Sequence, residues 1–312
     1  MSKKTVFIDG REGTTGLRIF ERLSARDDIE MIVLPDDVRK DPDARREALH
    51  KADAAFLCLP DDAARESAAL AEGSDVILID TSTAHRTSPA WAYGFPELSP
   101  ESEAKIRASR RIAVPGCHAS GFISLVYPLV KAGVLPADAA LTCHSITGYS
   151  GGGKKMIAQY EADGRDAALD SPRQYALGQT HKHLPEMTAI TGLSRAPIFC
   201  PIVSDYYAGM TVTVPVFADQ LAEGATVEAI KDAYRRTYAD GLVSYDESIL
   251  AGGFVAANPL AGIDSMKIAV SGNEERILLI SHFDNLGKGA SGAAVQCLNL
   301  VFGLPMETGL NV

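Results

Sequence analysis

The stretch Val6-Phe7-Ile8-Asp9-Gly10-Arg11-Glu12-Gly13-Thr14-Thr15-Gly16 decides the fold. A short apolar strand leads directly into the pattern Gly10-x-x-Gly13-x-x-Gly16, after which apolar residues recur at helical spacing. Glycines in such a strand–loop–helix let the backbone approach a pyrophosphate at the helix N-terminus, where Thr14 and Thr15 can add hydroxyl donors. The pattern favours a dinucleotide site, although a glycine-rich turn in an unrelated α/β protein has the same spacing.

Strand and helix signals alternate through the next hundred residues. Apolar strands are predicted over 29–34, 54–59, 76–79 and 112–114, with helix N-caps at Asp41 and at Asp61 or Asp62. Continuous apolar strands alternating with helices indicate an α/β domain, with a Rossmann-like, doubly wound parallel sheet covered on both faces.

The pattern changes after about residue 135. Strands are predicted over 141–147, 198–203, 210–217, 266–271 and 277–283, with a turn at Gly272-Asn273, and helices over 227–238 and 289–302. Because turns rather than helices separate most of these strands, we expect an α+β domain on a mainly antiparallel sheet, with helices on one face.

Composition excludes several classes of protein. The 312 residues predict about two domains, and 46% hydrophobic with 22% charged residues exclude disordered, collagen-like and coiled-coil chains. The net charge of −10 disfavours nucleic acid and anionic membranes as partners. No apolar run approaches the ~20 residues of a membrane span, and Met1–Lys4 lack the features of a signal peptide. Five scattered cysteines indicate reduced thiols and a cytoplasmic location.

Cys117 is the candidate nucleophile. It follows the strand 112–114 and a Pro115-Gly116 turn, at the predicted start of a helix. A positive helix end lowers the pKa of a thiol and favours the reactive thiolate. The alternative is a small buried cysteine at an element junction, which is our interpretation of the other four cysteines, Cys58, Cys143, Cys200 and Cys297.

The segment His181-Lys182-His183-Leu184-Pro185-Glu186 offers a base for that thiol. Histidine titrates in the right range, and Glu186 could orient an imidazole. Three alternatives remain open: a zinc site with His-x-His spacing, a plain polar loop, and His118 as a rival base, disfavoured because neighbouring helical residues point in different directions.

Two further segments suit anions. The donor-rich loop Ser150-Gly151-Gly152-Gly153-Lys154 could hold a phosphate or carboxylate, and Arg86 follows the fourth parallel strand at the ligand-binding edge of such sheets. Both are equally consistent with ordinary surface positions. Asp36 and Asp37 follow the second strand and lean slightly towards NAD, although Arg39 and Lys40 are near.

With these residues in hand, the chain resembles the short-form N-acetyl-gamma-glutamyl-phosphate reductases, relatives of the aspartate-semialdehyde and glyceraldehyde-phosphate dehydrogenases. The resemblance covers nearly the whole chain. The segments that carry it are Asp80–Arg86, Tyr93–Leu98, Pro115–Cys117, Gly148–Lys154, His181–Glu186 and Lys288–Gln296.

The resemblance implies a function in arginine biosynthesis: NADPH-dependent reduction of N-acetyl-gamma-glutamyl phosphate through a cysteine thioester. It implies Cys117 as nucleophile and His181 as base, with His183 and Glu186 as further candidates, and no metal. NADP would be held by Gly10, Gly13, Thr14, Thr15, Gly16, Ser82, Asn285, Gly287 and Gly289, and the small-molecule acyl phosphate by Arg86, Ser150, Gly152 and Lys154. It also implies a homodimer or homotetramer.

The resemblance further implies an inserted domain. Residues 1–117 and 284–312 would form the NADP-binding domain, and 118–283 the catalytic and oligomerisation domain. Long-form members differ at His118-Ala119-Ser120, where they have Tyr-Pro-Thr, and at Gly152 and Lys154, where they have Ala and Arg. Other hypotheses kept open are an aspartate-semialdehyde dehydrogenase-type acyl-phosphate reductase, a zinc hydrolase and an NADP-binding sensor.

Overall fold

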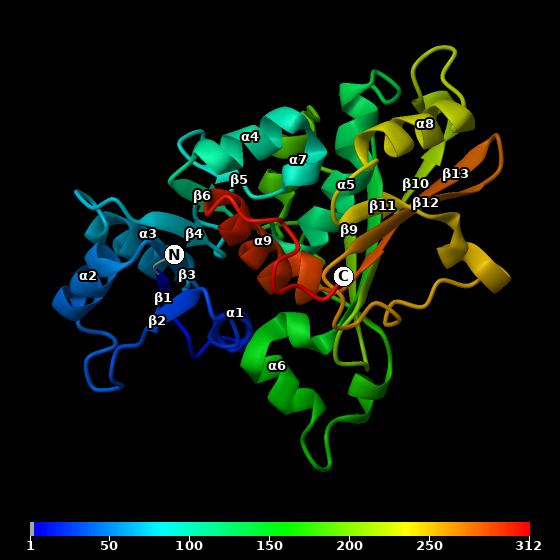
Figure 1. The fold of residues 1–312 in the computed structure, drawn as a ribbon. Helices are drawn as coiled ribbons and strands as arrows, with labels where there is room; N and C mark the ends of the chain where they lie inside the picture. The colour runs from blue at the N-terminus through cyan, green and yellow to red at the C-terminus, as the bar shows by residue number, and fades with distance from the viewer. Residues whose placement is uncertain (1–2) are drawn as a thin grey trace. The chain divides into compact units, whose positions relative to one another are not determined.

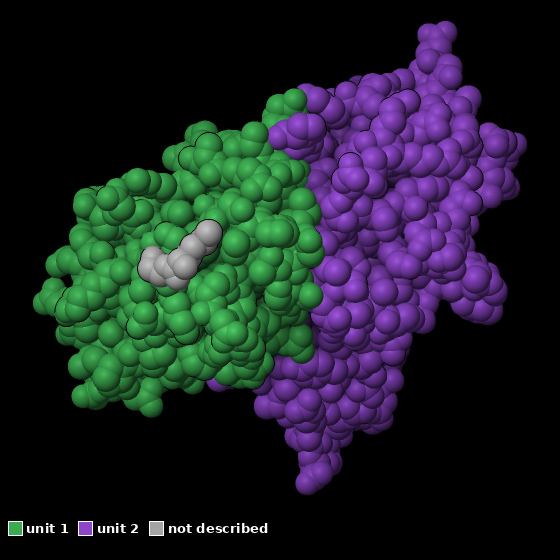
Figure 2. Space-filling view, viewed as in Figure 1, with its two compact units in different colours: residues 1–96, 101–115, 290–310 green, residues 97–100, 116–289, 311–312 purple. Residues whose placement is uncertain are grey.

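A computed structural model describes residues 3–312. Met1 and Ser2, on which part of the signal-peptide prediction rests, lie outside the described residues. The chain forms two compact units (Figure 2): unit 1 is Met1–Pro96, Glu101–Pro115 and Ala290–Leu310, and unit 2 is Glu97–Pro100, Gly116–Gly289 and Asn311–Val312. No helix among the described residues is long and apolar enough to cross a membrane.

Unit 1 is built on a six-stranded sheet in the order β2-β1-β3-β4-β6-β5, in which every pairing is parallel. The strands are β1 (Lys4–Asp9), β2 (Ile29–Ile32), β3 (Ala54–Leu57), β4 (Ile77–Asp80), β5 (Ala92–Tyr93) and β6 (Arg111–Ala113). This confirms the predicted doubly wound parallel sheet. The order reverses between β1 and β3, and open sheets bind ligands at such a switch point.

Helices cover both faces of this sheet (Figure 1). One core contains Ile19 of α1 (Thr14–Ser24), Ile106 of α4 (Pro100–Ala108) and Leu298 of α9 (Gly292–Val301). The other contains Leu49 of α2 (Pro42–Lys51) and Ala64 of α3 (Asp61–Leu70). The final helix therefore packs on the sheet formed by the first third of the chain.

The two N-cap predictions for these helices had different outcomes. Asp41 caps α2, accepting hydrogen bonds from the backbone of Asp43 and Ala44 at 3.0 and 2.9 Å. The prediction for α3 is wrong: its N-cap is Pro60, and Asp61 is the first helical residue. Its carboxylate instead accepts from the backbone of Thr83 at 3.0 Å, so it ties α3 to the loop after β4.

Unit 2 is built on a seven-stranded sheet in the order β11-β12-β13-β10-β7-β9-β8. The strands are β7 (Thr142–Gly148), β8 (Arg173–Gln174), β9 (Ile198–Ser204), β10 (Met210–Phe217), β11 (Val243–Tyr245), β12 (Met266–Gly272) and β13 (Arg276–Phe283). Four pairings are antiparallel, and the β11–β12 and β7–β9 pairings are parallel. The sheet is therefore mainly antiparallel, as predicted, with two parallel pairings that make it mixed.

The helices of unit 2 are α5 (Cys117–Lys131), α6 (Gly153–Tyr160), α7 (Leu184–Thr191) and α8 (Val227–Thr237). Helix α5 packs against β10 and β13 so closely that a Cβ on Gly121 would lie 2.4 Å from Cγ2 of Val212. Shorter helical turns are Pro96–Leu98, Tyr149–Gly152, Ala167–Asp170, Ala218–Gln220 and Glu247–Gly253, and the π-helical turn Gly287–Ser291. The helix predicted over 289–302 therefore begins as this π turn.

The units differ from the domains expected from the sequence at four segments. Unit 2, and not unit 1, contains residues 97–100, 116–117, 284–289 and 311–312. The π turn is the point at which the chain leaves unit 2 for α9. The functional assignment of the two domains stays a prediction.

Candidate active site

Cys117 is the first residue of α5, a 15-residue helix whose N-cap is Gly116. No side chain caps this end of the helix. Backbone N–H groups in the first turn of a helix have no partner inside the helix and carry partial positive charge. The thiol therefore stands at a helix end that stabilises negative charge. Burial, by contrast, raises the pKa of the Cys143 thiol and, to about 12, that of Cys58, so both stay protonated.

His181 lies in a cluster of rings in the same unit. Its ring centroid is 4.7 Å from that of His183, 5.7 Å from that of His118 and 5.1 Å from that of Phe199. The backbone N–H of His183 donates to Nδ1 of His181 at 3.2 Å. A ring nitrogen that accepts a hydrogen bond carries no proton, so the neutral imidazole of His181 holds its proton on Nε2.

The loop before α7 holds His181 in place. Gln179 has a left-handed backbone with φ 54°, and its side-chain amide pairs with both backbone groups of Phe199 at 2.8 Å. These two hydrogen bonds tie the loop to β9. Within residues 3–312 no three His, Cys, Asp or Glu side chains are grouped as metal ligands.

Glu186 contacts the turn that precedes Cys117. Its side chain is 1% exposed, and Oε1 accepts from the backbone N–H of Gly116 at 2.9 Å. The sequence suggested that Glu186 orients an imidazole, and the contact seen here is with the residue before Cys117. Helix α7 begins at Leu184, two residues before Glu186 and directly after His183. Its first turn therefore connects the segment that holds His181 and His183 with the start of α5.

The segment after β13 also packs on Cys117. A Cβ on Gly289 would lie 2.9 Å from Cβ of Cys117, and one on Gly287 would lie 2.5 Å from the carbonyl oxygen of Ile263. Both positions therefore require glycine. Asn285 accepts from the backbone N–H of Gly209 at 2.9 Å and donates to Oγ of Ser150 at 3.1 Å. The sequence analysis assigned Asn285 to NADP and Ser150 to the acyl phosphate, whereas in the structure the two side chains are hydrogen-bonded to each other.

The expected phosphate loop begins with this Ser150, which is 1% exposed, whereas Gly152 and Lys154 are exposed. Gly152 precedes α6, and Lys154 is the second residue of that helix. Lys154 is therefore free to turn towards an anion, while Ser150 is a fixed part of the loop's base.

Sequence reasoning missed a buried ion pair in unit 2. Nζ of Lys288 lies 2.7 and 2.8 Å from the two carboxylate oxygens of Glu97, and both side chains are 2% exposed. Glu97 also accepts from the backbone of Leu242 at 3.3 Å. Both residues belong to segments that carry the family resemblance, Tyr93–Leu98 and Lys288–Gln296, so the sequence did mark them. Their pairing could not be predicted, because no spacing rule connects residues so far apart in the chain.

In unit 1 the glycine loop joins β1 to α1, and two of its glycines are required by close packing. Gly10 has φ +87°, and a Cβ there would lie 2.3 Å from the carbonyl oxygen of Cys58. A Cβ on Gly16 would lie 2.6 Å from the carbonyl oxygen of Gly10, so loop and helix pack tightly. Gly13 is the N-cap of α1, with no side-chain cap. Oγ1 of Thr14 is buried and has no hydrogen-bond partner among residues 3–312, and Thr15 is half-buried beside it.

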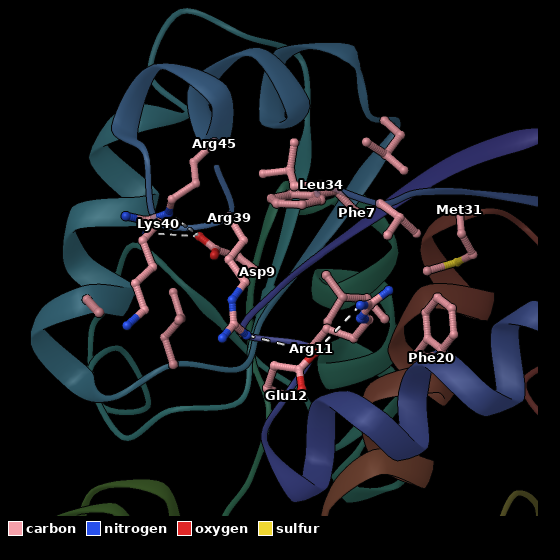
Figure 3. Close-up of a pocket in the computed structure, with 16 residues that line it drawn as sticks. Phe7, Asp9, Arg11, Glu12, Phe20, Met31, Leu34, Arg39, Lys40 and Arg45 are labelled. Carbon is pink, nitrogen blue, oxygen red and sulfur yellow. Dashed lines mark hydrogen bonds and ion pairs between the residues drawn. The ribbon is translucent and has the colours of Figure 1, made fainter. Parts of the chain in front are cut away.

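A cavity of about 310 Å³ lies beside this loop (Figure 3). Arg11, Glu12, Arg39 and Lys40 contribute polar side chains to its lining, and the ends of β1 and β2 contribute apolar ones. Arg11 comes from the glycine loop itself, and Arg39 and Lys40 come from the segment after β2, where dinucleotide folds read the adenosine ribose. The position of Asp36 in the sequence slightly favoured NAD as the cofactor. In the structure Asp36 is not among the residues that line this cavity, and 84% of its side chain is exposed.

Ser82 and Arg86 belong to a tight turn after β4. Asp80 accepts from the backbone and hydroxyl of Ser82, both at 2.8 Å, and from Nδ1 of His85 at 2.7 Å. Arg86 is 8% exposed and donates to the carbonyl oxygens of Val114 and Thr81 at 2.9 and 3.0 Å. These bonds fix the loop that leads to Pro115, and a role of Arg86 as a substrate clamp stays a prediction.

Two family models match the chain. Residues 35–106 match the semialdehyde dehydrogenase NAD binding domain, and residues 117–285 match the semialdehyde dehydrogenase dimerisation domain. Among solved structures, the chain is similar to aspartate semialdehyde dehydrogenase II complexed with ASA from Vibrio cholerae (TM-score 0.72, 18% identity, 97% of this chain and 99% of that chain). It is also similar to aspartate semialdehyde dehydrogenase with NADP from Candida albicans (TM-score 0.66, 15% identity, 96% and 99%). These define the fold class as that of the semialdehyde dehydrogenases.

Curated relatives are much more similar in sequence. An N-acetyl-gamma-glutamyl-phosphate reductase from Sinorhizobium medicae is 45% identical over 307 residues, covering 96% of this chain and 99% of the relative. N-acetyl-gamma-glutamyl-phosphate reductase 2 from Nostoc sp. is 42% identical over 322 residues, covering 99% and 100%. The chain belongs to the N-acetyl-gamma-glutamyl-phosphate reductase family, as the resemblance implied.

Proposed function

We propose that the protein catalyses the NADPH-dependent reduction of N-acetyl-gamma-glutamyl phosphate to N-acetylglutamate semialdehyde and phosphate, in arginine biosynthesis. The observation that carries this proposal is Cys117 at an uncapped helix N-terminus, in one unit with the ring-enclosed His181. Relatives that are 42–45% identical over nearly the full chain bear the name of this activity. The aspartate semialdehyde dehydrogenases share the fold at only 13–18% identity. They therefore support the alternative, an aspartate-semialdehyde dehydrogenase-type activity, far less.

The residues of unit 1 fit a bound NADP. The buried Oγ1 of Thr14 and the backbone of Gly10, Gly13 and Gly16 suit the pyrophosphate. Arg39 and Lys40 suit the additional phosphate that distinguishes NADP from NAD. In unit 2, Gly287 and Gly289 are buried and pack against Ile263 and Cys117, so the backbone there approaches the candidate nucleophile closely. When bound, NADPH supplies the hydride.

The chain's own groups carry the remaining chemistry. The Cys117 thiolate attacks the acyl carbon, the C–S bond forms, and the C–O bond to phosphate breaks, which leaves a thioester. Uncapped N–H groups of α5 stabilise the negative oxygen as charge develops. The Nε2 proton of His181 supports the hemithioacetal oxygen that forms on reduction, and collapse then releases the aldehyde and restores the thiolate.

Activity assays test this proposal directly. NADP reduction is followed with N-acetylglutamate semialdehyde and phosphate, in parallel with aspartate semialdehyde and glyceraldehyde phosphate. Cys117→Ser should abolish turnover while NADPH binding, measured by fluorescence, stays intact. Near-normal turnover in that variant, or a clear preference for either rival aldehyde, would overturn the proposal.

We also propose a homodimer or homotetramer in the cytoplasm. The matched domain is described as a dimerisation domain in its family. Four apolar side chains on one face of the unit 2 sheet support self-association, because large exposed apolar residues gathered on one face mark interaction surfaces. They are Ile146, Ile198, Phe217 and Leu278, with 39%, 61%, 60% and 39% exposure. Their strand register places them all on the same side of the sheet.

A further inference from the structure

A buried hydrogen-bonded chain in unit 2 runs through His118, which the mechanism above does not use. Nδ1 of His118 lies 2.6 Å from Oγ of Ser145, and Nε2 lies 2.6 Å from the phenol oxygen of Tyr175. His118 is 3% exposed and Ser145 is fully buried. The three residues come from α5, β7 and the segment after β8, so the chain links three separate parts of the unit.

Burial is the main influence on the pKa values of the titratable groups in this row of hydrogen bonds. Burial, and secondarily the charge of His181, lowers the pKa of His118 to about 3, so the ring is neutral at physiological pH. A neutral imidazole donates at one nitrogen and accepts at the other. Burial, and secondarily the charge of Cys117, raises the pKa of Tyr175, which therefore stays a phenol. His118 is thus no rival base, since both of its nitrogens are engaged.

The same residues form a wall around His181. The ring centroid of Tyr175 lies 6.0 Å from that of His181 and that of His118 lies 5.7 Å away, both edge-on. On the other sides stand Phe199 and His183. The titratable groups around His118 are Ser145 from β7, Tyr175, His181 and His183 from the segments before α7, and Cys117 on its own helix. His181 is half-buried and also lines a surface pocket, so these ring contacts restrict the rotation of its imidazole from one side.

We propose that Tyr175 and His118 are positioning residues, which hold the imidazole of His181 in the orientation that the chemistry at Cys117 requires. This positioning role rests on the proposed function, because the substrate is the one named there. It goes beyond that function because it assigns a role to Tyr175 and His118, which the proposed mechanism does not use.

The test removes one hydroxyl. Tyr175→Phe keeps the ring in the wall but leaves a nitrogen of His118 without its partner. Because a small misplacement of a catalytic group costs up to about 10²-fold in rate, we expect kcat to fall ten- to a hundredfold with KM within twofold. Ser145→Ala, at the other end of the chain, should act in the same direction. His118→Gln, which keeps one donor and one acceptor, should retain more activity than His118→Leu.

Tyr238→Phe is the matched control. Tyr238 is also buried, and its phenol donates to the carbonyl oxygen of Ser124 on the same helix α5, at 2.7 Å. It should cost similar stability in urea unfolding but leave kcat unchanged. If Tyr238→Phe and Tyr175→Phe lower kcat equally, the effect is a general loss of stability and the proposal is wrong.

A readout without substrate separates the two proposals. The pH dependence of Cys117 alkylation by iodoacetamide reports how well the thiolate is stabilised. Tyr175→Phe should move its midpoint to higher pH, since a displaced Nε2 proton supports the thiolate less, whereas Tyr238→Phe should not. An inactive wild type with this shift would refute the proposed function alone. Wild-type activity with unchanged kcat and midpoint in Tyr175→Phe would refute the positioning role alone.

Discussion

Arg39 is expected to decide which dinucleotide the protein binds. It lines the cavity beside the glycine loop, with 42% of its side chain exposed. Its nearest carboxylate oxygens belong to Glu12 and Asp36, at 3.9 and 4.0 Å. Exposed pairs at such distances contribute little to stability. Arg39→Ala should therefore leave folding intact and act on ligand binding.

The expected loss follows from the charge on the ligand. A hydrogen bond to a charged group contributes about 1.5–3 kcal/mol, and the exposure of Arg39 favours the lower end because solvent and salt screen the contact. A loss of about 1.5–2 kcal/mol corresponds to about ten- to thirtyfold weaker NADPH binding. NADH lacks the extra phosphate, so its affinity should change by less than about twofold.

Calorimetric titration of both dinucleotides at low and high salt measures this difference. The difference between the coenzymes should shrink as salt rises. Arg46→Ala is the control, because Arg46 stands outside the cavity lining, pairs with Asp43 at 3.3 Å and is 53% exposed. An equal loss for NADPH and NADH in Arg39→Ala, or no loss for either, would refute the assignment of Arg39 to the extra phosphate.

Three other changes have defined outcomes. Glu97→Gln should destabilise the fold by about 3–5 kcal/mol in urea unfolding, because it removes the carboxylate that balances the buried charge of Lys288. Glu97→Gln combined with Lys288→Met should cost less than the sum of the two single losses, and additive losses would contradict the pairing. The pKa of His118 is lower in the folded than in the unfolded protein, so the unfolded state binds a proton first as pH falls. Between about pH 6 and 4, each unit of acidification should therefore cost the wild type about 1.4 kcal/mol more stability than it costs His118→Gln. Parallel stability curves would contradict this. Finally, Phe217→Asp and Leu278→Asp should reduce the mass of the particle measured by light scattering, and an unchanged mass would place the interface elsewhere.

Periodicity predicted most of the fold because hydrophobic burial repeats locally. The longer strands of both sheets were found to within a few residues, and β10 was placed at its observed bounds, Met210–Phe217, whereas the short strands β5, β8 and β11 were not predicted. The misses are elements without an apolar repeat. Strand β8 is two residues long, and the helix end at Asp61 was misjudged because the carboxylate bonds to Thr83 across the chain rather than to its own first turn.

The candidate site was less predictable, because its contacts cross long stretches of sequence. The sequence could suggest Cys117 and His181 from local chemistry alone. It could not show that Glu186 bonds to the backbone before Cys117, or that Ser150 and Asn285 bond to each other. Such pairs follow from the packing of sheets and helices, and no spacing along the chain encodes them.

An acidic chain that binds two anionic ligands must concentrate positive potential locally, and this fold does so largely with backbone. At Cys117, Glu186 takes the N–H of Gly116 and leaves the first turn of α5 uncapped. Gly289 brings its backbone, without a side chain, against the same residue. In the proposed mechanism the N–H groups of one helix end would stabilise the thiolate and then the oxygen of its thioester, whereas a capping side chain would have occupied them. The buried carboxylate of Glu186, bonded one residue earlier, fixes this end of the helix without using the donors that the chemistry needs.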